Sequence, residues 1–272
     1  EGKEGVWQGP VFPVSLPLLL HTCLREAAMH RLLTFSALLA LLVLGLATPG
    51  DLQGQTQRLR PVTVGSPMPD FTLPVFQGGE LTLGELRGSN LMIVFPRGRS
   101  RPGSWCHICP YQHSELVEYD AETNWQGRAN LKILFVLPYS RDLVAEWIDA
   151  YPQLLVDIEE GKNPPNPESL DEAGRARMER QREIYPKSFS ASVGEVPTPF
   201  PILVDGDRAL SEGLGFFTTD WGGSTAEQNV PTILIVDAQG VLQFKYMSQN
   251  TIDRPPLEYL VQVVDVLNGM GG

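Results

Sequence analysis

The sequence predicts an α/β protein, built as one domain in which helices flank a mixed central sheet. Two nearly uninterrupted apolar runs, Asn90–Phe95 and Leu131–Leu137, are typical of strands buried on both faces of a sheet. Amphipathic helical patterns separate the predicted strands, and a hairpin followed by a helix closes the chain. Strands that alternate with helices indicate a layered architecture around a single sheet.

The first predicted elements form a strand extension ahead of the central sheet. Apolar and polar residues alternate at Phe71–Leu73, as in a half-buried strand, and a Gly-Gly pair marks a turn before a second short strand at Glu80–Leu83. The run Asn90–Phe95 ends at a proline, and we expect a helix over Tyr111–Trp125, where apolar side chains can share one face. A strand-to-helix junction therefore lies between these last two elements.

The middle of the chain contains a second strand and helix, followed by an insertion. After the strand Leu131–Leu137, the pattern at Arg141–Tyr151 predicts an amphipathic helix. Residues 159–190 change character, with two consecutive prolines and then a run rich in glutamate and arginine. We expect this segment to be a charged helical insertion whose arginines face water.

The last predicted elements complete the sheet. Phe200–Asp205 is expected to be a third strand, with a short helix after it at Ala209–Gly213. Val230–Val236 and Val241–Tyr246 are predicted to pair as a hairpin. Leu257–Leu267 has the pattern of a final amphipathic helix.

The residues that precede this domain have a different composition. Residues 1–28 begin without methionine, and we expect a spurious or disordered extension with Met29 as the true start. The basic stretch, 16-residue apolar run and small residues that follow predict a signal peptide over 29–47. Because about 20 apolar residues are needed to span a bilayer, we expect cleavage, no stable membrane insertion after processing, and a periplasmic or secreted protein. An uncleaved anchor is the alternative; residues 48–63 are predicted to be a linker and 64–270 the domain.

Charge and cysteine content narrow the possible functions. The formal net charge of −11 argues against nucleic acid or an anionic membrane as a partner, because both require a basic surface. Without the predicted leader, Cys106 and Cys109 are the only cysteines, and His107 and His113 the only histidines. All thiol and imidazole chemistry is therefore concentrated within one short segment.

The C-x-x-C pair admits several kinds of site. Haem attachment requires a histidine directly after the second cysteine, where Pro110 stands. A closed zinc site needs four ligands, of which Cys106, Cys109 and His113 would give three. A structural disulfide would close a very short loop and constrain the unfolded chain little. At a strand-to-helix junction the helix dipole favours thiolate, and His107 and, less directly, His113 could add positive charge, so we favour a redox pair without metal or cofactor.

Five segments, in their order along the chain, resemble the thioredoxin-fold superfamily and, within it, the peroxiredoxin-like group of alkyl hydroperoxide reductases and thiol-specific antioxidants. They are residues 65–74, 81–88, 91–98, 200–210 and 230–232. The resemblance covers about residues 64 to 268 and implies a thioredoxin-like fold. It also implies that Pro231, preceded by a cis bond, and Thr232 face the cysteines.

The resemblance leaves the order of attack by the two cysteines open. Peroxiredoxins carry P-x-x-x-[TS]-x-x-C, which Pro102 and Cys109 match in spacing, with Cys106 in place of the hydroxyl residue. In that alignment Cys109 attacks. The sequence Trp105-Cys106-x-x-Cys109 also resembles a thioredoxin motif, in which the first cysteine attacks. We favour Cys106 as nucleophile and Cys109 as resolver, because Cys106 begins the helix, adjoins His107 and is shielded on one side by Trp105.

An arginine is also expected near the thiolate. The related proteins with a C-x-x-C carry Arg-Gly shortly before the tryptophan, whereas six residues separate Gly98 from Trp105 here. Arg254 could be the late arginine that pairs with the thiolate; the alternative is an exposed arginine that caps the last helix.

Three functions follow from these patterns. The first is an exported antioxidant oxidoreductase that reduces peroxides with its C-x-x-C pair, through a sulfenic acid trapped as a disulfide. The second is an extracytoplasmic thioredoxin-like oxidoreductase that acts on protein disulfides. The third and least favoured is a copper chaperone that holds Cu(I) with the thiolates and His113. The first two require a thiol electron donor, either a thioredoxin-like protein or a small thiol.

Overall fold

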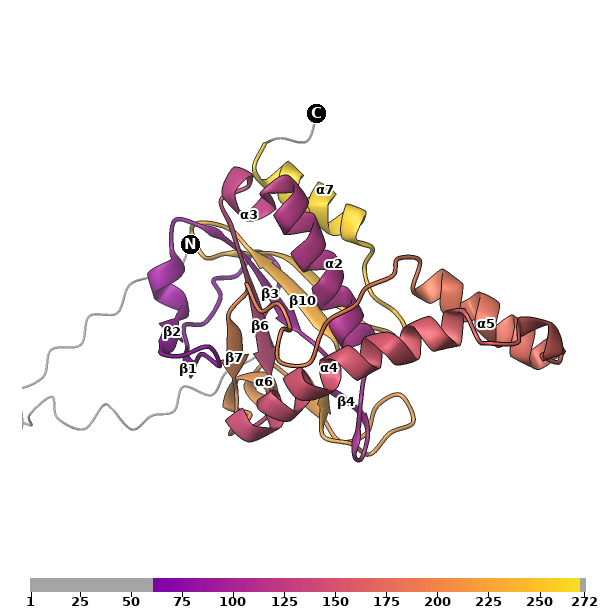
Figure 1. Cartoon of the computed structure of the whole chain (residues 1–272). Coiled ribbons are helices and arrows are strands. Elements are labelled where there is room, and N and C mark those ends of the chain that lie inside the picture. Colours follow the sequence, from indigo (N-terminus) through magenta and orange to yellow (C-terminus); the bar gives the residue numbers. More distant parts are fainter. Residues whose placement is uncertain (1–60, 270–272) are drawn as a thin grey trace, which may run out of the picture. The chain divides into compact units, whose positions relative to one another are not determined.

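The computed structural model describes residues 61–269 (Figure 1). The predicted extension and signal peptide, the linker up to residue 60, and residue 270 lie outside the described residues. None of the helices within residues 61–269 is both long and apolar enough to cross a bilayer.

A five-stranded mixed sheet forms the centre of the fold, as the sequence predicts. Its order is β11-β10-β3-β6-β7, in which β3 is parallel to β6 and β6 to β7, while β10 is antiparallel to both β3 and β11. Every residue of β3 and β10 is buried, because these strands lie inside the sheet and both faces are covered. The strand bounds are β3 Asn90–Phe95, β6 Leu131–Leu137, β7 Ile202–Val204, β10 Thr232–Val236 and β11 Leu242–Met247.

Alternating side chains of the sheet build two separate apolar clusters. Met92 and Val94 of β3 belong to the cluster that packs under the helices α2, α4 and α7 (Figure 1). Leu91, Ile93 and Phe95 belong to the other cluster, with the short helices η1 and α6. The helix bounds are α2 Ile108–Thr123, α3 Trp125–Arg128, α4 Arg141–Lys162, α6 Ala209–Gly213, α7 Leu257–Leu267 and η1 Leu83–Leu86.

The helix α4 is longer than the sequence predicts. The expected end at Tyr151, before Pro152, is wrong, because the helix continues through the proline to Lys162. Proline in a helix interior removes one backbone hydrogen bond and normally kinks or ends the helix. Here Leu154, Leu155 and Ile158 continue the buried stripe beyond Pro152, and burial of these side chains outweighs the lost bond.

Three short hairpins lie outside the central sheet. The predicted strand extension forms β1 (Thr72–Pro74) and β2 (Glu80–Thr82). The sequence analysis missed the other two, β4 (Arg99–Arg101) with β5 (Ser104–Trp105), and β8 (Phe217–Thr218) with β9 (Gln228–Asn229). These strands have only two or three residues, and no alternation of apolar and polar residues marks them in the sequence. The hairpin β4–β5 accounts for the six residues that separate Gly98 from Trp105.

The charged insertion contains η2 (Pro167–Ser169) and α5 (Glu172–Ile184). No residue of α5 is buried, as expected for a solvated helix. The helix runs back along the end of α4 (Figure 1), where Arg182 Nε donates to the carbonyl oxygen of Lys162 at 2.9 Å. The chain that follows α5 returns to the centre of the molecule at Tyr185, which is buried.

Candidate active site

The hairpin β4–β5 delivers both cysteines to the start of α2. The backbone N–H of Cys106 donates to the carbonyl oxygen of Gly98 at 2.8 Å, which ties the cysteine to the end of β3. The helix begins at Ile108, three residues earlier than predicted, because Pro110 is tolerated in a first turn where its missing N–H has no partner to lose. Cys109 therefore lies inside the first turn, and both cysteines are buried free thiols.

The two thiols have opposite acidities. A hydrogen bond from the Cys109 thiol is the largest effect that lowers the pKa of Cys106, which falls to about 5 against the opposing effect of burial. The backbone N–H of Cys109 and the charges of Arg254 and Arg97 lower it further. Burial raises the pKa of Cys109, and so does its role as donor to Cys106. The pair is thus poised with a thiolate at Cys106 and a protonated thiol at Cys109.

Arg97 is a buried charge beside the thiols. Its side chain is 5% exposed, and its Nε donates to Gln228 Oε1 at 2.7 Å. Burial lowers the pKa of Arg97, and the two cysteines oppose that shift. An arginine remains charged under such a shift, because its ordinary pKa exceeds 12. We did not predict Arg97 as a site residue; the sequence signals for it are its place just after β3 and the Arg-Gly pair that it forms with Gly98.

Arg254 approaches the thiols from the segment before α7. Its Nη1 donates to Ser248 Oγ at 3.1 Å and to the carbonyl oxygen of Asp253 at 2.6 Å. Its Nη2 is buried and has no partner among the described residues. The helix α7 begins after Pro256 without a side-chain cap, so Arg254 is not the exposed capping residue of the alternative interpretation. Its charge instead acts on Cys106 and Cys109.

Trp105 lies directly before the first cysteine and is buried. Its ring meets Tyr139 edge-on at 5.4 Å between centroids, and the guanidinium of Arg99 lies 4.9 Å from its centroid. The Tyr139 hydroxyl accepts from the N–H of Arg99 at 2.8 Å and donates to the carbonyl oxygen of Glu227 at 2.7 Å. Tyr139 thereby joins the hairpin, the tryptophan and the loop before β9 into one support for the cysteines.

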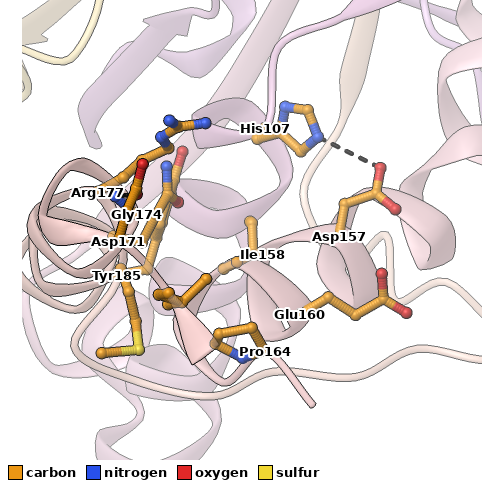
Figure 2. A pocket seen from close by; sticks show the side chains of 13 residues that line it. His107, Asp157, Ile158, Glu160, Pro164, Asp171, Gly174, Arg177 and Tyr185 are labelled. Atoms are coloured by element: carbon orange, nitrogen blue, oxygen red, sulfur yellow. Dashed lines mark hydrogen bonds and ion pairs between the residues drawn. The ribbon is translucent and has the colours of Figure 1, made fainter. Parts of the chain in front are cut away.

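The exposed side chain of His107 pairs with a carboxylate of α4. Figure 2 shows its ring directed towards Asp157 on α4, at 3.4 Å between Nε2 and Oδ2. The largest charged contributions to the pKa of Cys106 come from Arg254 and Arg97, not from this histidine. The two residues line a hollow of about 460 Å³ between α4 and α5, which Tyr185 and Arg177 also line.

The expectation that His113 adds positive charge is wrong. The side chain is 1% exposed, and burial lowers its pKa to about 3, so the imidazole is neutral. The Tyr151 hydroxyl donates to the carbonyl oxygen of Pro110 at 2.9 Å, and it therefore accepts from Nδ1–H of His113 at 3.0 Å. In this tautomer Nε2 carries no proton. It lies among aromatic rings and has no hydrogen-bond partner in the described part of the chain.

Pro231 and Thr232 lie beside the segment that leads to the cysteines. Thr232 pairs with Phe95 at the end of β3, and Asn229 N–H donates to the carbonyl oxygen of Arg97 at 3.2 Å. The predicted cis bond before Pro231 is wrong, since no peptide bond within residues 61–269 is cis. The trans bond lets the chain run straight into β10, and the Pro231 carbonyl oxygen accepts from Ser248 N–H at 2.9 Å, next to the β10–β11 ladder. A contact between Pro231 and the cysteines stays a prediction.

Tyr185 is a site residue that the sequence analysis missed. It follows α5, is buried, and meets the ring of Tyr111 edge-on at 5.0 Å between centroids. Burial raises the pKa of Tyr185, and the charges of Cys106 and Cys109 raise it further, which places its hydroxyl within electrostatic reach of both thiols. No pattern in the neighbouring sequence distinguishes Tyr185 from the solvent-exposed residues of the insertion.

The cysteines and His113 also bear on whether the site could hold a metal ion. Across residues 61–269, no three histidine, cysteine or acidic side chains converge closely enough to hold a metal ion. Cys106, Cys109 and His113 therefore do not form a three-ligand group in this structure.

A C-x-x-C at the start of a helix, beside a mixed sheet, also occurs in known protein families, to which this chain can be compared. A profile of the AhpC/TSA family matches residues 64–245, well over half of the chain. The chain belongs to the AhpC/TSA family. Membership in the AhpC/TSA family makes the protein a thiol-dependent oxidoreductase with a thioredoxin-like fold.

Solved structures of peroxiredoxins are similar to this AhpC/TSA chain. The reduced 2-Cys peroxiredoxin of Plasmodium vivax is 15% identical with a TM-score of 0.46, and the match covers 77% of this chain and 83% of that one. A cysteine-to-serine mutant of the peroxiredoxin 6 of Arenicola marina is 16% identical with a TM-score of 0.47, over 76% of this chain and 73% of that one. A search of curated proteins finds no match.

Proposed function

We propose that the protein reduces peroxides with Cys106 as the attacking thiolate and Cys109 as the resolving thiol. The observation that carries the proposal is the opposite perturbation of the two thiols, which lowers the pKa of Cys106 and raises that of Cys109. A thiolate is the nucleophile towards peroxide, whereas a protonated thiol is not. The family supports a peroxide as substrate and a thiol as reductant.

The proposed reaction has two steps at the cysteines. The Cys106 thiolate attacks one peroxide oxygen, so that an S–O bond forms, the O–O bond breaks, and the other oxygen leaves with a proton as water or an alcohol. Sulfur is oxidised by two electrons to a sulfenic acid. The Cys109 thiol then loses its proton and attacks the sulfenic sulfur, which forms the disulfide and releases water. A thiol donor returns the pair to two thiols by disulfide exchange.

The neighbouring residues have distinct parts in the proposed reaction. Arg97 and Arg254 hold positive charge near Cys106 and stabilise its buried thiolate. Hydrogen bonding by the Cys109 N–H and thiol lowers the pKa of Cys106, which indicates that the resolving group lies next to the sulfur that it must attack. Cys106 and Cys109 are three positions apart in the chain. Their sulfur atoms can therefore form a disulfide without a large movement of the backbone.

A direct assay tests the proposal. The purified protein should consume hydrogen peroxide in the presence of a thiol donor, and a Cys106→Ser, Cys109→Ser double variant should not. A protein that reduces insulin disulfides rapidly but consumes peroxide no faster than a free thiol would instead support the second function, protein disulfide exchange. That function is favoured by one observation, namely that the first cysteine of the pair is the acidic one, next to a buried tryptophan.

We also propose that the protein is exported. Support comes from the basic stretch and apolar run of residues 29–47, which match a secretory leader. The donor is then an extracytoplasmic thiol, either a thioredoxin-like protein or a small molecule. Mass spectrometry of the protein from its host tests this point, because an intact apolar segment at residues 32–47 would indicate a membrane anchor instead.

A further inference from the structure

A second hollow, which shares His107 with the one in Figure 2, has a different chemistry. It measures about 440 Å³ and is bounded by the hairpin β4–β5 and by residues 222–224. Trp105 and His107, the two neighbours of Cys106 in the chain, line it. Six further polar or small residues complete most of its wall: Arg97, Ser100, Arg101, Ser104, Gly222 and Ser224. We call this hollow the arginine pocket.

The arginine pocket has a strongly positive character in an acidic protein. No aspartate or glutamate lines it, although the chain has a net charge of −11. Neither Arg97 nor Arg101 forms an ion pair with a carboxylate within residues 61–269. Two guanidinium groups without acidic partners, in a concave site lined by the two chain neighbours of Cys106, favour an anionic ligand.

The arginine pocket is built into the fold by a buried network. Gln228 is 0% exposed, accepts from Arg97 Nε through Oε1, and donates through Nε2 to the carbonyl oxygens of Trp221 and Ser224, each at 3.3 Å. Arg97 Nη2 also donates to the carbonyl oxygen of Ser100 at 3.1 Å. The same glutamine therefore fixes the buried arginine and the facing loop, which leaves Arg97 Nη1 without an acceptor among the described residues.

Close packing also fixes the opposite wall. Gly222 has φ +62°, and a Cβ there would lie 2.3 Å from Thr251 Cγ2 and 3.4 Å from Arg97 Nη2. Only glycine fits here, because its φ is in the left-handed region and a Cβ would clash with the Thr251 methyl group. The wall that carries Arg97 is thus preformed, whereas Arg101 lies at the exposed end of β4.

The size of the arginine pocket indicates what it binds. A water molecule occupies roughly 30 Å³ of liquid volume, and hydrogen peroxide is only slightly larger, so it would leave most of the pocket unused. An organic molecule of about ten to fifteen heavy atoms fits the volume better. Guanidinium groups recognise carboxylates through paired, charge-assisted hydrogen bonds.

We infer that the arginine pocket binds the carboxylate of an organic hydroperoxide, with Arg97 and Arg101 as its partners and the peroxide group directed to Cys106. This inference rests on the proposed function and names the substrate class. The bonds formed and broken are those of the peroxide step above, with an alcohol that carries the carboxylate as the product. The same carboxylate chemistry could belong to a thiol donor, and the experiment below separates the two sources.

The first measurement is binding without reaction. Cumyl alcohol with a para-carboxylate and its methyl ester differ in charge at one position and contain no peroxide. Calorimetry should show that the carboxylate binds at least about tenfold more tightly than the ester, as expected for hydrogen bonds to a charged group. Arg101→Gln should remove this preference, whereas the matched control Arg177→Gln, in the hollow of Figure 2, should retain it. Equal binding of acid and ester would overturn the inference, whatever the protein does with peroxide.

The second measurement is the rate of thiol oxidation in a single turnover. The corresponding para-carboxylate hydroperoxide should react at least about tenfold faster than its ester, and Arg101→Gln should abolish the difference. Oxidation by both compounds at equal rates would overturn the inference but leave the proposed peroxidase function intact. Preferential binding of the carboxylate without oxidation by any peroxide would contradict the proposed function and leave the anion site standing. If Arg101→Gln slows only the reduction of the disulfide by a mercaptocarboxylate, the carboxylate belongs to the donor and the hydroperoxide assignment is wrong.

Discussion

The buried neutral imidazole of His113 makes the stability of the protein depend on pH in a specific way. Its pKa falls to about 3 in the folded protein because of burial, whereas an unfolded chain has a histidine pKa of roughly 6.5. Below that unfolded value the unfolded state binds a proton that the folded state does not, so stability is lost as the pH decreases from about 6.5 towards 3. At pH 5 the loss from this one group is about 2 kcal/mol relative to neutral pH.

Urea denaturation of the reduced protein at pH 7 and pH 5 measures this loss. The matched variant is His113→Phe, which keeps an aromatic ring against Phe135 and Phe200 but cannot take up a proton. The variant should lose less stability than the unaltered protein between the two pH values, by about 2 kcal/mol. Other titrating groups are common to both proteins and cancel in the comparison. Equal losses in both proteins would refute the assignment of His113 as a buried neutral base.

Two further predictions concern the cysteines and their support. Alkylation of Cys106 by iodoacetamide should be nearly independent of pH around neutrality and slow only as the pH falls towards about 5, where its thiolate is lost. Removal of a positive charge in Arg254→Gln should raise the pKa of Cys106 and move this decline to higher pH, while the exposed control Arg128→Gln should not; an unchanged profile in Arg254→Gln would contradict the electrostatic argument. Gly98→Ala should lower the urea midpoint and correspond to a loss of about 1–3 kcal/mol, because Gly98 has φ +76° and a Cβ there would lie 2.4 Å from the Tyr139 hydroxyl oxygen. A stability within error of the unaltered protein would show that this contact relaxes freely.

The parts of the fold that the sequence predicts well are those that depend on local pattern. The strands β3 and β6 are found where expected, because strands buried on both faces need uninterrupted apolar residues. The final helix has the predicted bounds, Leu257–Leu267, because its apolar stripe is regular. The end of α4 was placed wrongly, since local preference stops a helix at Pro152 whereas tertiary packing continues it.

Some residues of the candidate site can likewise be predicted from local sequence, whereas others depend on tertiary contacts. The cysteines and Trp105 are visible as a motif, and the structure places them together at the start of α2. Arg97 and Tyr185 acquire their roles only through partners remote in the chain. The buried partner of Arg97 is Gln228, 131 positions away, and Tyr185 comes within electrostatic reach of the thiols only because α5 returns along α4. No periodicity in a single sequence reports such contacts.

The location of the first sulfenic acid tests the central claim most directly. Cys106→Ser and Cys109→Ser variants are treated separately with hydrogen peroxide and a sulfenic acid trap, and the modified residue is identified by peptide mass spectrometry. The serine hydroxyl at position 109 can still donate to the Cys106 sulfur, so Cys109→Ser should form a trapped sulfenic acid at Cys106 rapidly. Cys106→Ser should react no faster than a free thiol. Rapid formation of sulfenic acid at Cys109 in Cys106→Ser, without reaction at Cys106 in the other variant, would contradict the assignment and make Cys109 the nucleophile.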